Sequence, residues 1–577
     1  MASLSLQQIL ELAQSWADAD PEPEMAAQLR EWIAQRDEHH LRECFEIPLL
    51  FGTAGLRGVV GPGPGHMNIA VVRRVTRALA DYLHANQLAS RPIVIGHDAR
   101  IDSERFAREA IAVARAAGAT VLEFGRQVPT PIVAYASLRQ NAAAGVVVTA
   151  SHNPPEYNGY KVYGQTGLQI VSPMDTLIEE RMHQMPGARA IRTQLEAPVT
   201  TAHLLGEDIV DSYMEDVLKQ RPAPVRYPIR LVYTPLHGVG WNTLQRLFTA
   251  AGYTDVHPVA EQVEPDGHFP TVTFPNPEEP GTLDLGMQLA QSVSAHALVA
   301  NDPDADRLAL ALPDSSGQWH TVTGNQLGVI LMDYLLERAV ATRANGRQPC
   351  VVTTLVSTPM ADSVASARGA HLERTLTGFK WLWTAALELL KDGSRTFAIA
   401  WEEALGYSTH TSVRDKDGIA AGLIAADWVA QCHAAGLLPW ERLGQLFREH
   451  GAWASRQHNF YCSGAGGAAA MQGALARLSS APPHTLNGVR VSRFDNYQLG
   501  AEDRPCWRGQ AELFALTFDD ESRLLVRPSG TEPKLKLYVD VPAAVRAGTN
   551  PFTALQSAGI RAEGLARSLI SAIGLNP

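Results

Sequence analysis

The feature of the sequence that most constrains its fold is a repeated alternation of short apolar runs with longer helical ones. An apolar run at residues 92–95 is followed by a helical pattern over residues 103–117, which Gly118 ends. Further apolar runs follow at residues 119–124 and 145–149, and the second of these leads into a polar turn. This alternation predicts βαβ units on a mostly parallel sheet, with the loops after the strands at one edge, where ligands usually bind.

The same alternation occurs again further along the chain and then changes. Apolar runs at residues 229–233, 297–300, 351–355 and 397–400 each lead into a loop, whereas residues 522–539 read as two strands around a turn, before a helix near the C-terminus. At roughly 100–200 residues per domain, 577 residues predict several domains. We therefore predict an α/β protein with three consecutive mixed-sheet α/β modules and a smaller C-terminal α+β domain.

The composition excludes several classes of protein. Hydrophobic residues make up 45% and charged residues 19% of the chain, which excludes wholesale disorder, and a net charge of −11 offers no general basic surface for nucleic acid. The N-terminus lacks the pattern of a secretory signal, and the apolar stretch at residues 418–432 contains Asp427 and is too short to span a bilayer. We expect a cytoplasmic protein with no nucleic-acid or membrane partner, and no protein partner is indicated.

The cysteines are sparse, odd in number and far apart, and they form no CxxC pair. This pattern argues against a disulfide framework and against a structural zinc site. We expect unpaired, buried thiols in a reducing compartment for all five: Cys44, Cys350, Cys432, Cys462 and Cys506.

The loop at residues 149–155, Thr-Ala-Ser-His-Asn-Pro-Pro, places a hydroxyl directly after an apolar run. Asn153 and the two prolines favour a tight, preset turn that could hold Ser151 exposed and oriented. Serine is a poor nucleophile unless a base or a metal assists it. Lys161, ten residues later, could move protons if its neighbours lower its pKa. A simple capped turn is the alternative interpretation.

Three aspartates, Asp302, Asp304 and Asp306, alternate directly after the run at residues 297–300. In extended backbone, alternate side chains point the same way, so three like charges repel unless a cation lies between them. Oxygen-only ligands suit Mg²⁺. An EF-hand is excluded because its required glycine and glutamate positions hold Arg307 and Pro313 here. A solvated acidic turn remains an alternative.

The segment at residues 527–534, Arg-Pro-Ser-Gly-Thr-Glu-Pro-Lys, contains the groups of a phosphate-binding loop. Arg527 offers a planar fork and Lys534 a point charge. Ser529 and Thr531 offer hydroxyls, and the backbone around Gly530 offers N–H groups. The alternative is a hairpin turn with solvated charges.

Two further loops carry polar groups after strand-like runs, and a glycine-rich segment lies near the N-terminus. Glu402 could accept two sugar hydroxyl hydrogens, although a carboxylate at a helix N-terminus fits equally well. The segment at residues 51–58 contains Arg57 and could approach an anion, but it is not a nucleotide P-loop. An ordinary flexible loop is the alternative interpretation of this segment. Together the hydroxyl, the Mg²⁺ site, the phosphate loop and the sugar-type carboxylate suggest phosphoryl transfer to or from a phosphorylated polyol.

At these residues the sequence resembles the α-D-phosphohexomutase superfamily, and it is most similar to the phosphoglucomutase/phosphopentomutase branch. The matching segments are FGTAGLRG, TASHNPPEYNGYKVY, NDPDADRLAL, LTGFKW, WEEALGY, RDKDG and RPSGTEPKLKLY. The resemblance implies four domains around a central cleft. These would be 1–205, with an N-terminal helical extension and the phosphoserine loop; 206–318, with the metal-binding loop; 319–455, with sugar-recognition loops; and 456–577, a linker and a phosphate-binding domain.

The resemblance also implies catalytic and metal-binding roles. Ser151 would be carried as phosphoserine, with Arg57 and His152 beside it. Lys161 and Lys416 match the family's acid/base candidates. One Mg²⁺ per active site would be held by the phosphoserine and three carboxylates, those of Asp302, Asp304 and Asp306.

Substrate contacts are implied in the same way. Arg307 would contact the reacting phosphate and Glu402 the sugar hydroxyls, while Thr377 and Gly378 match a loop that helps sort two binding poses. The clamp for the non-reacting phosphate would consist of Arg527, Ser529, Gly530, Thr531 and Lys534.

The implied reaction interconverts a sugar 1-phosphate and 6-phosphate, first of all those of α-D-glucose, through a sugar bisphosphate that also serves as activator. The site must be enclosed, because water would otherwise take the phosphoryl group. Ala404 stands where many hexose-specific relatives have serine, so phosphopentomutase activity on ribose or deoxyribose phosphate, or phosphomannomutase activity, remains an alternative.

Two rival functions account for fewer of these residues. A Mg²⁺-dependent sugar phosphatase would not need the second phosphate site at residues 527–534. An inactive sugar-phosphate-binding protein would not need Ser151, Lys161 and the three aspartates intact.

Overall fold

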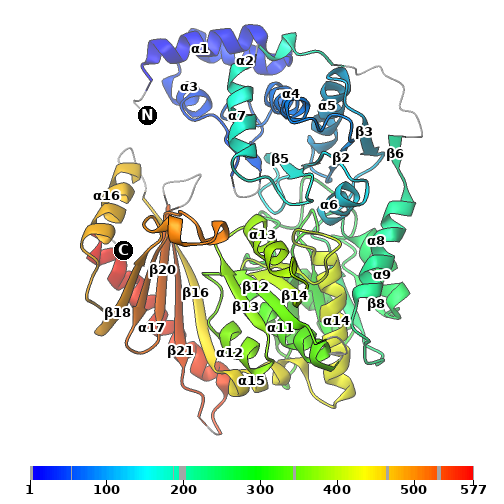
Figure 1. Ribbon diagram of the computed structural model, residues 1–577, viewed down its shortest axis with the longest axis vertical. Coiled ribbons are helices and arrows are strands. Elements are labelled where there is room, and N and C mark those ends of the chain that lie inside the picture. Colours follow the sequence, from blue (N-terminus) through cyan, green and yellow to red (C-terminus); the bar gives the residue numbers. More distant parts are fainter. Residues whose placement is uncertain are drawn as a thin grey trace. The chain divides into compact units, whose positions relative to one another are not determined.

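The chain folds into two compact units, which are described separately. The computed structural model describes residues 4–52, 55–185, 187–193, 203–341, 346–462, 467–528, 534–546 and 548–575. The first unit comprises Met1–Pro224, Pro228–Ala311 and Gly406–Asp427, and the second comprises Val225–Tyr227, Leu312–Leu405 and Trp428–Pro577. Many of their helices and strands are labelled in Figure 1.

Three N-terminal helices precede the first sheet: α1 (Leu6–Ala19), α2 (Pro23–Gln35) and α3 (Glu38–Phe45). They pack on one another through a small cluster that includes Ile9, Leu29 and Leu41. A carboxylate oxygen of Glu22 accepts a hydrogen bond from the backbone N–H of Ile69 (2.7 Å), at the start of the next helix. The N-terminal helices are therefore fixed to the α/β module that follows them.

The first sheet is mixed, with the strand order β1-β5-β4-β2-β3-β6. Strands β4, β2, β3 and β6 run parallel, whereas β5 pairs antiparallel with β1 and with β4. Every residue of β2 and β4 is buried, as expected for central strands covered on both faces. The strands are β1 (Leu56–Val59), β2 (Ile93–His97), β3 (Val121–Phe124), β4 (Ala144–Val148), β5 (Tyr157–Gly164) and β6 (Leu204–Leu205).

Helices cover this sheet because each presents an apolar stripe. In α4 the buried residues Val72, Val75, Leu79 and Leu83 recur at helical spacing, and the side chain of Asn68 caps the helix start by accepting from Val71 N (2.9 Å). The helices of this module are α4 (Ile69–Ala85), α5 (Ser103–Ala116), α6 (Thr130–Arg139) and α7 (Met174–Gln184). They form the blue to cyan part of Figure 1.

The second sheet of the first unit has the order β10-β9-β7-β8. Strands β7, β8 and β9 are parallel, and β10 pairs antiparallel with β9. The strands are β7 (Leu231–Thr234), β8 (Val256–Pro258), β9 (Ala297–Ala300) and β10 (Ala309–Pro313), and the helices are α8 (Glu207–Gln220), α9 (Trp241–Ala251) and α10 (Asp284–Ser292). The loops after β4 and β9 carry the predicted serine and aspartates.

In the second unit, a sheet with the parallel order β13-β12-β14 is followed by a sheet with the order β16-β21-β20-β19-β18-β17. The second of these is antiparallel throughout its registered pairs, and α17 packs against β16 and β21. Its last strands and α17 are orange to red in Figure 1.

The elements of this part of the chain have the following bounds. The strands are β11 (Trp319–Val322), β12 (Gln348–Thr354), β13 (His371–Thr375), β14 (Arg395–Glu402), β15 (Gly406–Ser408), β16 (Ala452–Tyr461), β17 (Thr485–Leu486), β18 (Val489–Asn496), β19 (Phe514–Phe518), β20 (Arg523–Pro528) and β21 (Lys534–Ala543). The helices are α11 (Gly324–Ala341), α12 (Met360–Ala367), α13 (Phe379–Leu390), α14 (Gly418–Ala434), α15 (Pro439–His450), α16 (Gly467–Ser480) and α17 (Pro551–Ala572).

The predicted fold class, three α/β modules and a C-terminal α+β domain, is confirmed by these four sheets. The domain boundaries at 205, 318 and 455 stay predictions. The cysteines are unpaired as expected, and four are buried, but Cys506 is exposed because it lies in a short surface 3₁₀ turn rather than in a strand or helix that packs on a core. Among the described helices, none is long and apolar enough to cross a bilayer.

Two helical glycines allow a test of the packing, because replacing them by alanine should change the free energy of unfolding in opposite directions. A Cβ at Gly328, in α11, would lie against the buried Trp401 indole ring at less than van der Waals separation. A Cβ at Gly473, in α16, would meet nothing within 4 Å. We expect Gly328→Ala to destabilise the protein by about 1–3 kcal/mol through overpacking. We expect Gly473→Ala to stabilise it by about 0.4–1 kcal/mol through reduced entropy of the unfolded chain.

Calorimetric unfolding of the two variants beside the parent protein checks this prediction. A lower unfolding temperature for Gly328→Ala and a higher one for Gly473→Ala is the expected result. Equal shifts of the same sign would show that the close packing of α11 on β14 is not as described.

Candidate active site

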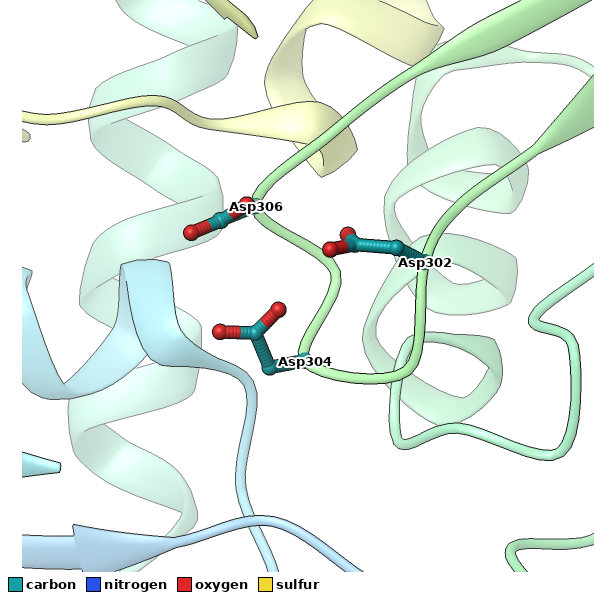
Figure 2. Close-up of side chains that lie close together, drawn as sticks. All are labelled: Asp302, Asp304 and Asp306. Carbon is teal, nitrogen blue, oxygen red and sulfur yellow. The ribbon is translucent and has the colours of Figure 1, made fainter. Parts of the chain in front are cut away.

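The three aspartates lie in the loop between β9 and β10, and their side chains converge (Figure 2). Asp302, Asp304 and Asp306 are buried, and one carboxylate oxygen of each lies within 4.8 Å of the others. Extended backbone was predicted for this loop from the sequence, but the loop is not extended. It is a turn in which Ala305 N donates to Asp302 O (2.8 Å) and Ala305 has a left-handed φ of 58°. The turn, rather than strand alternation, brings the carboxylates together.

The donor set fits a divalent cation. Asp304 Oδ1 and Asp306 Oδ1 are buried and have no hydrogen-bond partner. Burial and the charges of the other two aspartates raise the pKa of Asp302 well above its usual value. Within the described residues, this trio is the one group of acidic, histidine or cysteine side chains that could hold a metal. A hard cation with oxygen ligands would satisfy the free oxygens and offset the repulsion.

Ser151 follows β4 and lies beside the aspartates. Its Oγ donates to Asp302 Oδ2 (2.6 Å) and lies 3.1 Å from His152 Nδ1. The prediction that the loop holds Ser151 exposed is wrong, because its relative exposure is 2%. The aspartate loop approaches it from the second sheet and covers it. The predicted nucleophile and the predicted metal ligands therefore form one buried cluster.

Two residues after β2 hold the serine loop, and the sequence analysis missed both. Arg100 donates to the backbone carbonyls of Ser151 (2.7 Å) and Pro154 (2.7 Å). Asp98 accepts hydrogen bonds from the Arg100 backbone N–H (3.0 Å) and from the Thr149 hydroxyl (2.5 Å). The available signal was an Asp-x-Arg sequence at the carboxyl end of a buried strand, next to the strand that carries the serine.

Lys161, on β5, pairs with two of the aspartates. Its Nζ lies 2.7 Å from Asp304 Oδ2 and 2.8 Å from Asp306 Oδ2. Burial alone would lower the pKa of Lys161, but the two carboxylates outweigh burial and raise it. The neighbours thus have the opposite effect from the one that proton transfer by this lysine was expected to need.

Asp304 is anchored from the first sheet as well. The hydroxyl of Thr130, at the start of α6, donates to Asp304 Oδ2 (2.7 Å), and its backbone N–H donates to Asp304 O (2.9 Å). Burial alone would raise the pKa of Asp304, whereas Lys161 and the Thr130 hydroxyl lower it. Thr130 has no signal of its own in the sequence, because 174 residues separate it from its partner.

Lys416 also reaches the cluster. Its Nζ lies 3.3 Å from Asp306 Oδ2 and 3.6 Å from Asp415 Oδ1. Asp415 is itself buried and accepts hydrogen bonds from the Tyr163 hydroxyl (2.7 Å) and from Gln169 (2.6 Å). Asp415 therefore fixes the loop of Lys416 to β5, and sequence reasoning did not single it out.

Two guanidinium groups make the surroundings of Ser151 positive. Arg57 donates to Asn153 Oδ1 (2.9 Å), and burial lowers its pKa to about 10. Arg307 N donates to Asp302 Oδ1 (2.9 Å). Burial, together with Arg307 and Arg57, lowers the pKa of His152 well below its usual value. The Nε atoms of both arginines are buried without a hydrogen-bond partner, so each could donate to a bound anion.

Glu402, Thr377, Gly378 and Arg527, which are predicted to contact the sugar or the non-reacting phosphate, belong to the second unit. Glu402 Oε1 accepts a hydrogen bond from Gly378 N (2.5 Å). Arg527 donates to the Tyr538 hydroxyl (3.1 Å), and its pKa, which burial alone would lower, is raised by Tyr538, Glu403 and Glu402. The fork of Arg527 and the carboxylate of Glu402 thus act on each other electrostatically.

The remaining predicted residues of this unit are placed as follows. Thr377 lies in the loop between β13 and α13, next to Gly378. Lys534 begins β21, with its Nζ 5.3 Å from the ring centroid of Tyr461. The other predicted clamp residues lie outside the described residues: Ser529, Gly530 and Thr531.

Four family models match the chain in order. They are described as phosphoglucomutase/phosphomannomutase, alpha/beta/alpha domains I, II and III, at residues 48–187, 211–316 and 323–442, and the C-terminal domain at residues 489–548. The chain belongs to the phosphoglucomutase/phosphomannomutase family, and so to the α-D-phosphohexomutase superfamily. The family suggested by the sequence motifs is therefore confirmed.

Individual relatives agree with this assignment. The chain is 37% identical to a protein named "Probable phosphomannomutase" from Haemophilus influenzae, over 82% of this chain and 93% of that one. It is 33% identical to the phosphopentomutase of Mus musculus, over 92% and 89%. A crystal structure of a phosphoglucomutase/phosphomannomutase family protein from Burkholderia thailandensis has the same fold, with a TM-score of 0.64 at 21% identity, over 91% and 98%. As a member of this family, the protein with the present sequence is a phospho-sugar mutase, an isomerase.

The acidic trio generates a prediction about metal binding. Asp304→Asn removes one of three negative charges and keeps the shape of the side chain. Losing even an outer partner of a metal ligand typically costs about 10–100-fold in affinity, so we expect the Mg²⁺ dissociation constant to rise by at least about tenfold. Titration calorimetry with MgCl₂ measures it.

The matched control is Asp255→Asn, an exposed aspartate of the same unit that pairs with Arg230 (2.9 Å). This change should leave the dissociation constant as it is. Equal Mg²⁺ binding by the Asp304→Asn variant and the parent protein would contradict the assignment of the trio.

Proposed function

We propose that the protein interconverts the 1-phosphate and 6-phosphate of a hexose, first of all α-D-glucose, through phosphoserine at Ser151. The observation that carries this proposal is the 2.6 Å hydrogen bond from Ser151 Oγ to Asp302 Oδ2. This hydrogen bond joins the hydroxyl that follows β4 of the first sheet to the acidic trio that follows β9 of the second sheet. The buried, partnerless Nε atoms of Arg57 and Arg307 support a phosphoryl group beside this hydroxyl.

In the proposed reaction, phosphorylated Ser151 first donates its phosphoryl group to the free hydroxyl of a sugar monophosphate. The bond from Oγ to phosphorus breaks, a bond from the sugar oxygen to phosphorus forms, and the hydroxyl proton leaves the sugar. The resulting bisphosphate reorients within the site and returns its other phosphoryl group to Ser151. Both steps use the same groups, so the reaction is reversible and the bisphosphate can act as an activator.

The residues of the first unit would have different roles in this transfer. Arg57 and Arg307 would bind the phosphoryl oxygens, with His152 beside them. Lys161 and Lys416 are the candidates for carrying the hydroxyl proton. The raised pKa of Lys161 favours its protonated form, which suits it to donate a proton rather than to accept one. A Mg²⁺ held by Ser151 and the acidic trio would neutralise negative charge on the transferring phosphoryl group.

The residues of the second unit would bind the rest of the sugar phosphate. Glu402 would accept hydrogen bonds from sugar hydroxyls, and its bond to the backbone of Gly378 supports a shared role with the pose-sorting loop at Thr377 and Gly378. The electrostatic interaction of Arg527 with Glu402 supports a phosphate clamp near the sugar-reading carboxylate. The clamp would comprise Arg527, Ser529, Gly530, Thr531 and Lys534.

A phosphopentomutase is the second candidate, and Ala404 favours it. With no hydroxyl at this position, one hydrogen bond to a hexose hydroxyl is missing, and a sugar lacking that hydroxyl loses nothing. The similarity to the mouse phosphopentomutase agrees with this alternative. Mannose phosphates are a third choice of substrate, in line with the Haemophilus influenzae relative.

The nucleophile is tested by Ser151→Ala. We expect mutase turnover to fall to background while sugar-phosphate binding is kept, because only the group that carries the phosphoryl is removed. A coupled assay measures turnover and calorimetry measures binding. The control is Ser137→Ala, a buried serine of the same unit whose Oγ donates to Val133 O (2.7 Å). Undiminished turnover in Ser151→Ala would reject the phosphoserine mechanism.

The substrate is tested by kcat/KM values for glucose 1-phosphate, mannose 1-phosphate and ribose 1-phosphate with a trace of bisphosphate. We expect Ala404→Ser to raise the ratio of glucose to ribose kcat/KM by about 3–10-fold, because it restores a hydroxyl that a hexose can bond. A parent enzyme that prefers ribose would establish the second candidate instead of the first. Free phosphate as the main product would identify a phosphatase.

A further inference from the structure

The backbone of Ser151 adopts a conformation that few residues with a side chain adopt. Its φ is 54°, in the left-handed region. Such a residue keeps this conformation only where its surroundings determine it. The direction of Oγ toward Asp302 depends on this backbone, so the groups that hold the N–H and C=O of Ser151 also determine where its hydroxyl lies.

The N–H of Ser151 is held by a hydroxyl bridge, in which one threonine hydroxyl accepts a hydrogen bond from it and donates another to a carboxylate. Ser151 N donates to Thr149 Oγ1 (2.8 Å), and Thr149 Oγ1 donates in turn to Asp98 Oδ2 (2.5 Å). The other oxygen of Asp98 accepts from Arg100 N (3.0 Å) and from the Ser103 hydroxyl (2.5 Å). Asp98 therefore anchors the bridge from the neighbouring strand.

The C=O of Ser151 is held by the Arg100 side chain. Nη2 of Arg100 donates to Ser151 O (2.7 Å), and Nη1 donates to Pro154 O (2.7 Å) and to Tyr157 O (3.0 Å). Arg100 also donates to Asn153 O. One buried guanidinium thus spans the serine loop along its length, which a lysine, with its single ammonium, cannot do.

The second sheet repeats the hydroxyl bridge without the arginine. At the end of β7, Thr234 Oγ1 accepts from Leu236 N (3.0 Å) and donates to Gln262 Oε1 (2.6 Å), and Leu236 has a φ of 48°. Among the hydrogen bonds of the described residues, none runs from an arginine to the Leu236 carbonyl. The loop after β7 therefore keeps a left-handed residue without an arginine on its carbonyl, so the arginine at Ser151 is an addition to the shared bridge.

We propose that Asp98, Thr149 and Arg100 are positioning residues that fix Ser151 for phosphoryl transfer. The inference rests on the proposed function, because it takes Ser151 as the residue that carries the phosphoryl group. None of the three is among the residues proposed to touch the sugar phosphate. Their loss should slow phosphoryl transfer to and from Ser151 and leave the KM for sugar phosphate unchanged.

The first experiment compares two isosteric threonine changes. Thr149→Val and Thr234→Val each remove one buried bridging hydroxyl. Each leaves a backbone N–H unpaired, together with a carboxylate oxygen of Asp98 in the first case and an amide oxygen of Gln262 in the second. We expect both to lower the unfolding temperature, and Thr149→Val to lower it more, because it leaves a charged acceptor without its hydroxyl. Phosphoserine formation from labelled glucose 1,6-bisphosphate, measured in a single turnover with Mg²⁺, should slow by about 10–100-fold in Thr149→Val and by less than about threefold in Thr234→Val. Thr149→Ser, which keeps the hydroxyl, should restore the parent rate.

The second experiment compares the buried Arg100 with the partly buried Arg74 and covers the case in which Thr149→Val does not fold. Arg100→Lys keeps the charge and removes the fork. Arg74→Lys makes the same change at an arginine whose Nη2 donates to Met182 O (3.1 Å), a backbone carbonyl of α7 and not of the serine loop. We expect the single-turnover rate to fall by about tenfold or more in Arg100→Lys and to stay unchanged in Arg74→Lys.

The outcomes separate the inference from the proposed function. Equal slowing in Thr149→Val and Thr234→Val, or a parent-like rate in Arg100→Lys, would overturn the positioning role while Ser151→Ala stays inactive. Mutase turnover in Ser151→Ala, or label that is absent from Ser151 by mass spectrometry, would overturn the proposed function itself. A higher KM for sugar phosphate with an unchanged single-turnover rate would also overturn the positioning role.

Discussion

The rest of the first unit depends on holding three like charges together away from water. The carboxylates of Asp302, Asp304 and Asp306 are buried within 4.8 Å of one another, which is unfavourable unless positive charge and hydrogen-bond donors surround them. The structure supplies the ammonium of Lys161 and the hydroxyls of Thr130 and Ser151. All three donors come from the first sheet and its helices, whereas the aspartates follow a strand of the second sheet. The electrostatic requirement of one loop therefore determines how two α/β modules meet.

Much of the fold was predictable because buried parallel strands have a simple sequence pattern. Strands β2, β4 and β9 lie within two residues of the predicted runs, since a strand covered on both faces is apolar along its length. The serine and the aspartates were predictable for a related reason, because polar residues that directly follow such strands collect at one edge of the sheet.

The parts that could not be predicted depend on contacts between distant segments. The turn that gathers the aspartates depends on a left-handed Ala305, and alanine gives no signal for that conformation. The burial of Ser151 depends on a loop 151 residues away. Asp98, Arg100 and Asp415 look like ordinary surface charges in the sequence, and only their partners in the fold show that they hold functional loops in place.

Under the proposed phosphoserine mechanism, the burial of Ser151 affects how long the enzyme stays phosphorylated. Because Ser151 is only 2% exposed, little bulk water surrounds a phosphoryl group carried there before a sugar binds. A phosphoryl group carried there would outlast the departure of each product and wait for the next sugar. One loading of the enzyme would then serve a long series of conversions, and a fresh supply of bisphosphate would be needed only after an intermediate had escaped into solution.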